Sequence, residues 1–110
     1  MKIDNTNSLV ELYFKKYNEF KNKKNPSFLF GLSSKDRNYS LNWNEATSKI
    51  RCLTTFLQDY ISTGDRCVLL SENRPQWLIA DIAIMNSGGV TVPLFTTYSE
   101  SDYELSLIHI

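Results

Sequence analysis

The sequence predicts an α/β fold that contains one parallel βαβ unit, and three observations lead to this prediction. A continuous apolar run at residues 67–71 is typical of a strand buried on both faces of a sheet. A helical segment that is apolar nearly all round follows at residues 75–87, and a second strand-like run lies at residues 90–94. Two such strands joined by a helix form one parallel crossover, which packing makes right-handed.

The first part of the chain predicts a helix and a β-hairpin. Apolar side chains recur at steps of four, four and three at Leu9, Tyr13, Tyr17 and Phe20. This spacing predicts a helix from Ser8 to about Lys23 with one apolar face. Its lysines would also suit a helix that binds a membrane surface or nucleic acid. A helix that packs against the rest of the protein by its apolar stripe is favoured. Residues 27–32 and 38–43 predict half-buried strands joined by a polar turn at residues 33–37.

The next helix has a clear start signal. Asn42 lies three residues before Glu45, and this spacing predicts a capping box. Apolar residues then recur at steps of three and four, which indicates an amphipathic helix. They are Trp43, Ala46, Ile50, Leu53, Leu57, Tyr60 and Ile61. We expect this helix to end near Ser62, with Gly64 just past the end in a left-handed conformation.

The boundaries of the apolar helix at residues 75–87 also follow from local signals. Asn73 is predicted to cap it, with Pro75 in the first turn, where a missing N–H is harmless. Gly88 and Gly89 follow a helix and precede a strand, so we interpret them as a C-cap and a tight turn. A phosphate-binding loop would need the opposite order. Ser99 and Asp102 predict the start of a further helix.

Composition restricts the classes of function. The chain has 110 residues, and its 12 lysines and arginines balance 12 aspartates and glutamates. This neutrality argues against a general binder of nucleic acid, which needs excess positive charge. The first residues contain no apolar run typical of a signal peptide, and no transmembrane segment is expected. Cys52 and Cys67 are therefore predicted to be free, buried thiols of a protein in a reducing cytoplasm.

No residue combination predicts chemistry. The only histidine, His109, has no orienting partner and lies next to the end of the sequence given. Asp65, Glu72 and Asp81 are charged residues at strand ends or on the apolar helix, and Asp81 would need a partner if it were buried. The loop with Thr96, Thr97 and Tyr98 follows a strand and could border a site, although caps and turns explain it better. We predict no catalytic, cofactor-binding or metal-binding residue.

Several motifs in residues 64–103 occur in an order that resembles a known family. They are Gly64-Asp65-Arg66-Cys67-Val68, Glu72-Asn73-Arg74-Pro75-Gln76-Trp77, Gly88-Gly89, Val92-Pro93-Leu94 and Thr97-Tyr98-Ser99. Upstream, Asn42-Trp43-Asn44-Glu45 is similar to the Thr-Trp-x-Glu helix start of the same family, with asparagine as the cap. The chain thus resembles the N-terminal region of long-chain acyl-CoA synthetases, which belong to the acyl-adenylate-forming, AMP-binding superfamily.

The resemblance implies that residues 1–110 form an incomplete N-terminal part of an adenylate-forming domain. The parent enzyme would use ATP, Mg²⁺ and coenzyme A to convert a fatty acid into acyl-CoA, AMP and pyrophosphate. It would be cytoplasmic, and peripheral contact with a membrane is left open. The phosphate loop, the ribose-binding aspartate and the C-terminal lysine of the family have no counterpart here, so this chain is expected to bind no cofactor and to be inactive.

Two further expectations concern the chain's integrity. Residues 105–110 depart from the family pattern, which suggests a non-native tail. The remainder of the domain is the expected partner, and without it the far side of the helix at residues 77–85 should lie exposed. The alternative function is a small non-catalytic α/β interaction module, which would need a self-sufficient core.

Overall fold

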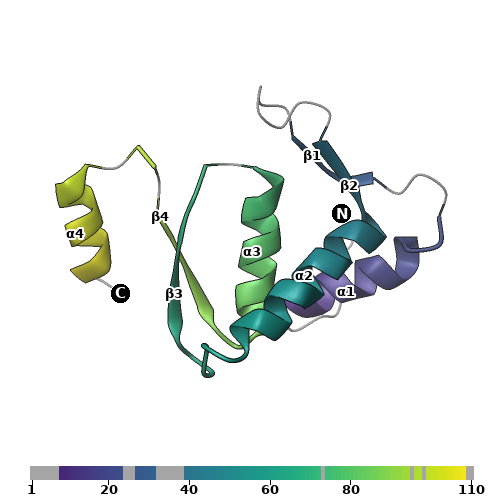
Figure 1. The fold of residues 1–110 in the computed structure, drawn as a ribbon, viewed down its shortest axis with the longest axis horizontal. Helices are drawn as coiled ribbons and strands as arrows, with labels where there is room; N and C mark the ends of the chain where they lie inside the picture. The colour runs from purple at the N-terminus through teal and green to yellow at the C-terminus, as the bar shows by residue number, and fades with distance from the viewer. Residues whose placement is uncertain are drawn as a thin grey trace.

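The computed structural model describes residues 8–23, 27–31, 39–72, 74–94, 96–97 and 99–108, which form four helices and four strands (Figure 1). In chain order the elements are α1 (Leu9–Phe20), β1 (Ser27–Gly31), β2 (Tyr39–Asn42), α2 (Trp43–Leu57), β3 (Arg66–Leu70), α3 (Pro75–Asn86), β4 (Val90–Leu94) and α4 (Glu100–Ile108). β1 pairs with β2 antiparallel, and β3 pairs with β4 in parallel. The predicted hairpin, capped helix and parallel βαβ unit are confirmed.

α1 and the hairpin differ from prediction at their ends. α1 stops at Phe20, and the side chain of Ser8 caps it by accepting a hydrogen bond from the N–H of Glu11 at 3.1 Å. Of its predicted apolar stripe, Tyr13 is buried but Leu9 is 64% exposed, because the first turn of α1 extends past the core. Trp43 begins α2 instead of ending β2, and the predicted turn at residues 33–37 lies outside the described residues.

The predicted capping box of α2 is confirmed in both directions. The Asn42 side chain accepts from the N–H of Glu45 at 2.8 Å, and the Glu45 side chain accepts from the N–H of Asn42 at 3.1 Å. The predicted end near Ser62 is wrong, because hydrogen bonds of shorter span close the last turn. Among them, the N–H of Tyr60 donates to the carbonyl of Leu57 at 2.9 Å.

The loss of helical phase after α2 explains two further differences. Tyr60 is 71% exposed, although the helical spacing predicted it on the apolar face. Gly64 does have a left-handed backbone, with φ +89°, but it lies in the turn that enters β3 and does not cap α2. The glycine was thus predicted correctly in conformation and incorrectly in role.

The glycine pair after α3 forms the predicted helix cap. Gly88 has φ +91°, the N–H of Gly88 donates to the carbonyl of Met85 at 3.1 Å, and the N–H of Gly89 donates to the carbonyl of Ile84 at 3.0 Å. This pair of bonds is a Schellman motif. At the other end of α3, the prediction of Asn73 as cap is wrong. Pro75 is the first helical residue, so the cap position falls on Arg74, which is extended as residues before proline usually are.

The core lies where α2 crosses α3, with α1 and the hairpin beside it. Ala46, Ile50 and Ala83 are fully buried. The other buried members of this cluster are Tyr13, Leu41, Ile79 and Ile82. No residue of α3 between Trp77 and Met85 is classed as exposed, because helices cover one side and strands the other. The expectation that the far side of α3 would be bare is therefore wrong.

The bare apolar surface lies instead on the β3–β4 sheet. Val68, Leu70 and Val90 are 51%, 54% and 52% exposed, so the prediction that β3 is buried on both faces is wrong for this chain. α3 covers one face of the sheet, whereas α4 lies on the opposite side at some remove from the strands (Figure 1). Leu105 and Leu107 of α4 are also exposed, at 58% and 49%.

α4 begins with the second predicted capping box. The N–H of Ser99 donates to the Asp102 carboxylate at 2.9 Å, and the N–H of Asp102 donates to the Ser99 hydroxyl at 3.3 Å. These bonds from Ser99 lower the pKa of Asp102. The helix continues through Ile108, so residues 105–108 are helical. Whether the tail is native stays a prediction that the structure does not address.

Candidate functional site

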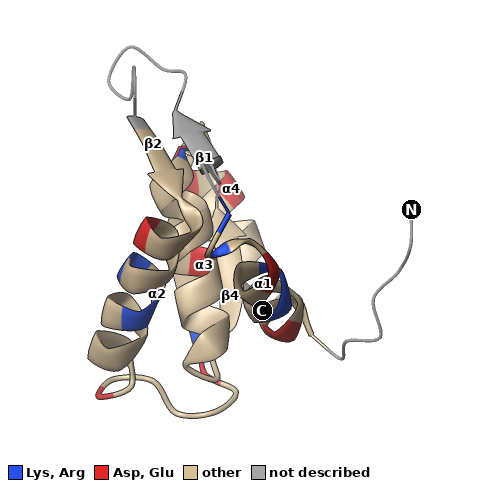
Figure 2. Ribbon diagram, turned by 90° about the vertical axis from the view of Figure 1, so that its right-hand side faces the viewer, with Lys and Arg blue, Asp and Glu red and all other residues tan. Residues whose placement is uncertain are grey.

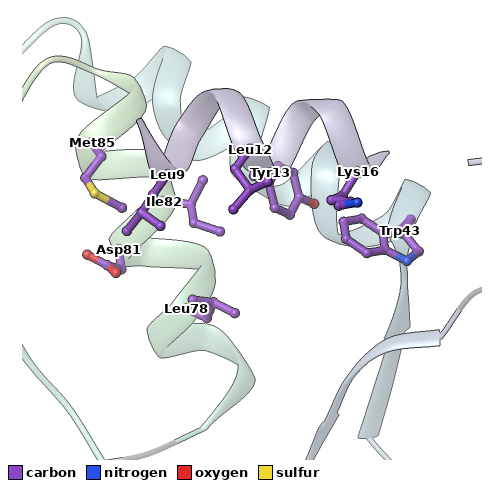
Figure 3. Close-up of a pocket in the computed structure, with 9 residues that line it drawn as sticks. All are labelled: Leu9, Leu12, Tyr13, Lys16, Trp43, Leu78, Asp81, Ile82 and Met85. Atoms are coloured by element: carbon purple, nitrogen blue, oxygen red, sulfur yellow. The ribbon is translucent and has the colours of Figure 1, made fainter. Parts of the chain in front are cut away.

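A largely apolar groove of about 230 Å³ lies between α1 and α3 (Figure 3). Its lining residues are Leu9, Leu12, Tyr13, Lys16, Trp43, Leu78, Asp81, Ile82 and Met85. In this view Lys16 and Trp43 lie together at one end, while Asp81 and Met85 lie at the other. Lys16 also forms an ion pair with Glu19 at 3.3 Å. With one cation and one carboxylate at opposite ends, the groove resembles a seam of the core more than a reaction site.

Charges on α1 and α2 do not gather into a single-signed surface. Figure 2 shows basic and acidic residues interspersed along α1 and α2. On α1, Glu11 and Glu19 flank Lys15 and Lys16. Since binding to nucleic acid or anionic lipid needs a continuous basic patch, this distribution supports the docked-helix interpretation of α1.

A buried hydrogen bond joins α1 to α2 beside this groove. The hydroxyls of Tyr13 and Thr47 lie 2.8 Å apart, and the two side chains are only 6% and 1% exposed. Burial raises the pKa of Tyr13, although the bond to Thr47 opposes that shift. The two residues are 34 positions apart, so no local pattern could have predicted the contact.

Replacing Tyr13 by phenylalanine should lower the free energy of unfolding by about 1–3 kcal/mol at neutral pH, because the Thr47 hydroxyl is left unsatisfied. The raised pKa of Tyr13 means that the folded state holds this proton more tightly than the unfolded state. The contribution of protonated Tyr13 to the free energy of unfolding is therefore complete below about pH 10. It is lost as pH rises through the pKa of Tyr13 in the folded state. The difference in free energy of unfolding between wild type and Tyr13→Phe should become smaller in that pH range.

Urea denaturation followed by tryptophan fluorescence at pH 7 and at pH 10–11 measures this effect. Tyr60→Phe is the matched control, since Tyr60 is 71% exposed, and it should change stability by less than about 0.5 kcal/mol. Equal losses for both variants at pH 7 would show that the Tyr13–Thr47 bond contributes nothing.

A second hollow, of about 420 Å³, lies between α3 and β4. It is lined by Trp77, Asp81, Met85, Gly89, Val90, Thr91 and Pro93. The Thr91 hydroxyl is buried and makes no hydrogen bond within the described part of the chain. Asp81 and Met85 border both hollows, so Asp81 lies on the ridge between them. Asp81 is half-buried and not fully buried, so its carboxylate does not need a basic partner.

The other acidic candidates do not form a pair. Asp65 precedes β3, and its carboxylate accepts from the N–H of Ser62 at 2.8 Å, which closes a turn. Glu72 follows the opposite end of β3 and is exposed. Because β3 separates them, they cannot act together as acid and base. Asp65 and Glu72 are therefore interpreted as residues at the two ends of a strand and not as a catalytic pair.

The loop after β4 lies at the carboxyl edge of the sheet, as predicted. Thr96 and Thr97 are exposed there. On the neighbouring strand end, the Ser71 hydroxyl donates to the carbonyl of Glu72 at 3.0 Å. Tyr98 and His109 lie outside the described residues. Hydroxyl groups therefore follow both strand ends at this edge, and nothing in the described residues assigns them a chemical role.

Both cysteines are free, but the prediction that they are buried is wrong: Cys52 is exposed and Cys67 is half-buried. Ile50 and Thr54 face the core, and the helical period turns Cys52 outward. Within the described ranges, no three His, Cys, Asp or Glu side chains are grouped so that they could hold a metal ion. Among the described helices, none has both the length and the apolar character needed to cross a bilayer.

Comparison with known proteins adds what the geometry lacks. A family model described as AMP-binding enzyme matches residues 17–109. Long-chain-fatty-acid–CoA ligase FadD15 of Mycobacterium bovis is 41% identical over 56 residues, which are 50% of this chain and 9% of that protein. Fatty acyl-CoA synthetase A of Dictyostelium discoideum is 37% identical over 49 residues, which are 44% of this chain and 7% of that protein.

A solved structure matches the fold over nearly the whole chain. The N-terminal subdomain of NpsA from Klebsiella oxytoca superimposes with a TM-score of 0.80 over 94% of this chain and 25% of that one, at 18% identity. At this identity the match shows the fold alone. The two relatives in sequence are far longer than this chain, whose matched segments span 9% and 7% of their lengths.

Proposed function

Because the chain belongs to the AMP-binding enzyme family, we propose that it is the N-terminal part of the adenylate-forming domain of a long-chain fatty acid–CoA ligase. The parent enzyme would join a fatty acid to ATP, release pyrophosphate, and then transfer the acyl group from the adenylate to coenzyme A, releasing AMP. Identity of 41% to a long-chain-fatty-acid–CoA ligase supports this substrate class.

Within this proposal the 110 residues are scaffold and are inactive alone. The observation that carries it is the bare sheet face, where Val68, Leu70 and Val90 are each about half exposed. Apolar side chains on a strand are normally covered by a further layer, and burying three of them stabilises a fold by several kcal/mol, at roughly 1.5–3 kcal/mol each. The rest of the domain would supply that layer.

The start of α3 does not favour the phosphates of ATP, and within the described ranges no three His, Cys, Asp or Glu side chains are grouped to hold Mg²⁺. The turn from β3 into α3 carries the exposed carboxylate of Glu72, which repels an anion. α3 then begins with Pro75, which lacks the N–H that a phosphate would accept. No catalytic step is therefore assigned to these residues, and ATP, Mg²⁺ and coenzyme A belong to the proposed parent.

We expect the purified 110-residue chain to form no acyl-CoA from palmitate, ATP, Mg²⁺ and coenzyme A above the rate without protein. Calorimetric titration with ATP should show no micromolar affinity, because the exposed carboxylate of Glu72 before α3 repels the phosphates. The longer translation product of the same gene is the positive control, and it should form acyl-CoA and release pyrophosphate.

Two outcomes would contradict different parts of the proposal. Turnover by the 110 residues alone would show that they are more than scaffold. A longer product that activates a different acid, or that forms an adenylate without passing it to coenzyme A, would remove the assignment as a long-chain ligase. Family membership would stand in either case.

A further inference from the structure

The hollow between α3 and β4 holds a carboxylate that no contact within the fold explains. Among the described residues that line this hollow, Asp81 is the one that carries a charge. Its side chain forms no hydrogen bond or ion pair within the part of the chain that the structure describes. A charged group on a mostly apolar helix is therefore available to a partner from outside the fold.

The surroundings of this carboxylate follow from the periods of the two elements. Trp77, Asp81 and Met85 succeed one another at steps of four along α3, so their side chains lie side by side on one face of the helix. Thr91 and Pro93 line the facing wall, and as alternate residues of β4 they leave the strand on the same side. The Asp81 carboxylate is thus flanked by an aromatic ring and a thioether, across from β4.

The direction of the carboxylate distinguishes this hollow from the groove between α1 and α3. Asp81 borders both, but in Figure 3 its carboxylate points away from Lys16 and Trp43, which lie at the other end of the groove. The Lys16 ammonium would repel a cation from that groove. The hollow beside β4 has no basic residue among its described lining residues, so Asp81 attracts a cation there and repels an anion.

The walls around Asp81 suit the remainder of such a cation. An ammonium group is attracted to the face of an indole ring, and the attraction grows where water is excluded. Met85, Val90 and Pro93 offer apolar surface to the methylene groups of an alkyl chain. The hollow has a volume of about 420 Å³, within the range of roughly 300–1,000 Å³ typical of small-molecule sites. Its size and lining therefore favour a small organic amine over a metal ion, which would need several oxygen ligands.

A buried hydroxyl in the facing wall is an independent indication of a ligand. Thr91 lines the hollow, and its Oγ1 is buried without a hydrogen-bond partner among the described residues. Unpaired buried polar atoms are uncommon and costly, because they have lost water without gaining a protein partner. A ligand with N–H donors would supply the missing bond, whereas a purely apolar ligand would not.

We propose that the hollow between α3 and β4 is a binding site for a small alkylammonium ion. Its cationic nitrogen lies between the Asp81 carboxylate and the Trp77 ring, and its chain lies against Met85 and Pro93. The site does not depend on the proposed function, since it uses residues of this chain and no step of the ligase reaction.

Titration of the 110-residue chain with n-pentylamine at pH 7, where the amine is protonated, tests the site by NMR. The indole N–H signal of Trp77 should shift with a dissociation constant of about 1 mM, an affinity open to so small a ligand. The indole signal of Trp43 should stay in place, because Trp43 lines the other groove. Shifts at Trp43, Val68 or Leu70 as large as that at Trp77 would show unselective apolar binding and overturn the proposal, as would the absence of any shift.

Substitutions at Asp81 test the charge. Asp81→Asn should weaken the binding of n-pentylamine by about tenfold or more, whereas Asp81→Glu keeps the charge and should stay within about threefold of the unsubstituted chain. Asp59→Asn is the matched control, because Asp59 is exposed and does not line the hollow, and it should leave binding unchanged. Urea midpoints show whether the Asp81 variants remain folded. Unchanged binding by a folded Asp81→Asn variant would contradict the proposal.

Analogues of the ligand test the same charge without a change in the protein. n-Pentanol and pentanoate carry the same chain with a neutral and an anionic head, and both should bind at least about tenfold more weakly than n-pentylamine. N-acetyl-lysine methylamide presents the same ammonium group on a peptide unit. Tighter binding of this peptide mimic than of n-pentylamine would make the hollow a docking site for a lysine side chain and overturn the assignment to a free amine.

Discussion

Replacing Ile50 by alanine should lower the free energy of unfolding of this chain by about 3 kcal/mol, within the range of roughly 2–5 kcal/mol found for such changes. Ile50 is 0% exposed and lies on the face of α2 that packs against α3. Its removal leaves a cavity beside Ala46 and Ala83, whose short side chains cannot move in to fill it. Because the free energy of unfolding of a small domain is only about 5–15 kcal/mol, this loss should be large enough to broaden or abolish the urea unfolding transition.

Urea denaturation with tryptophan fluorescence measures the loss, since Trp43 packs against the same cluster. Lys49→Ala is the matched control, because Lys49 is the preceding residue of α2 and points outward. It should change stability by less than about 0.5 kcal/mol. If Ile50→Ala costs no more than Lys49→Ala, the crossing of α2 and α3 is not the core of the folded state in solution.

The features predicted correctly from sequence are those whose partners lie within a few residues. Asn42 with Glu45, and Ser99 with Asp102, form capping boxes because the backbone geometry of a helix start brings positions three apart together. Gly88 was predicted as a helix cap for the same reason, since its bonds reach back only to the last turn of α3. Local chemistry decides these contacts whatever surrounds them.

The features that sequence missed depend on distant or absent parts of the fold. The Tyr13–Thr47 bond needs α1 to lie on α2 in one particular position, which no spacing encodes. The apolar run of β3 predicted burial on both faces, yet Val68 is 51% exposed. If the chain is part of a larger domain, as proposed, that pattern reflects a strand covered on both faces, whereas the described residues cover one face. The groove between α1 and α3 could not be predicted either, because residues far apart in the sequence line it.

The second large effect is expected at Gly88, where alanine should cost about 2–3 kcal/mol. Its φ of +91° disfavours any side chain, and a Cβ there would lie 3.2 Å from the Thr63 hydroxyl and 3.4 Å from its Cα. Gly64 provides a close control, because it has φ +89° and open space where a Cβ would go. Gly64→Ala should therefore show the backbone strain alone, at about 1–2 kcal/mol.

The difference between the two alanine variants isolates the contact with Thr63, because both lose the same unfolded-state freedom of glycine. Adding Thr63→Ala to Gly88→Ala removes the hydroxyl but leaves the Cα, so it should recover part of that difference. Urea denaturation midpoints, compared at constant slope, measure the stability of the unsubstituted chain and of the three variants. Equal costs at Gly64 and Gly88 would mean that the turn between α3 and β4 opens away from Thr63. The Schellman cap would then be held by its own two hydrogen bonds, without support from the turn that enters β3.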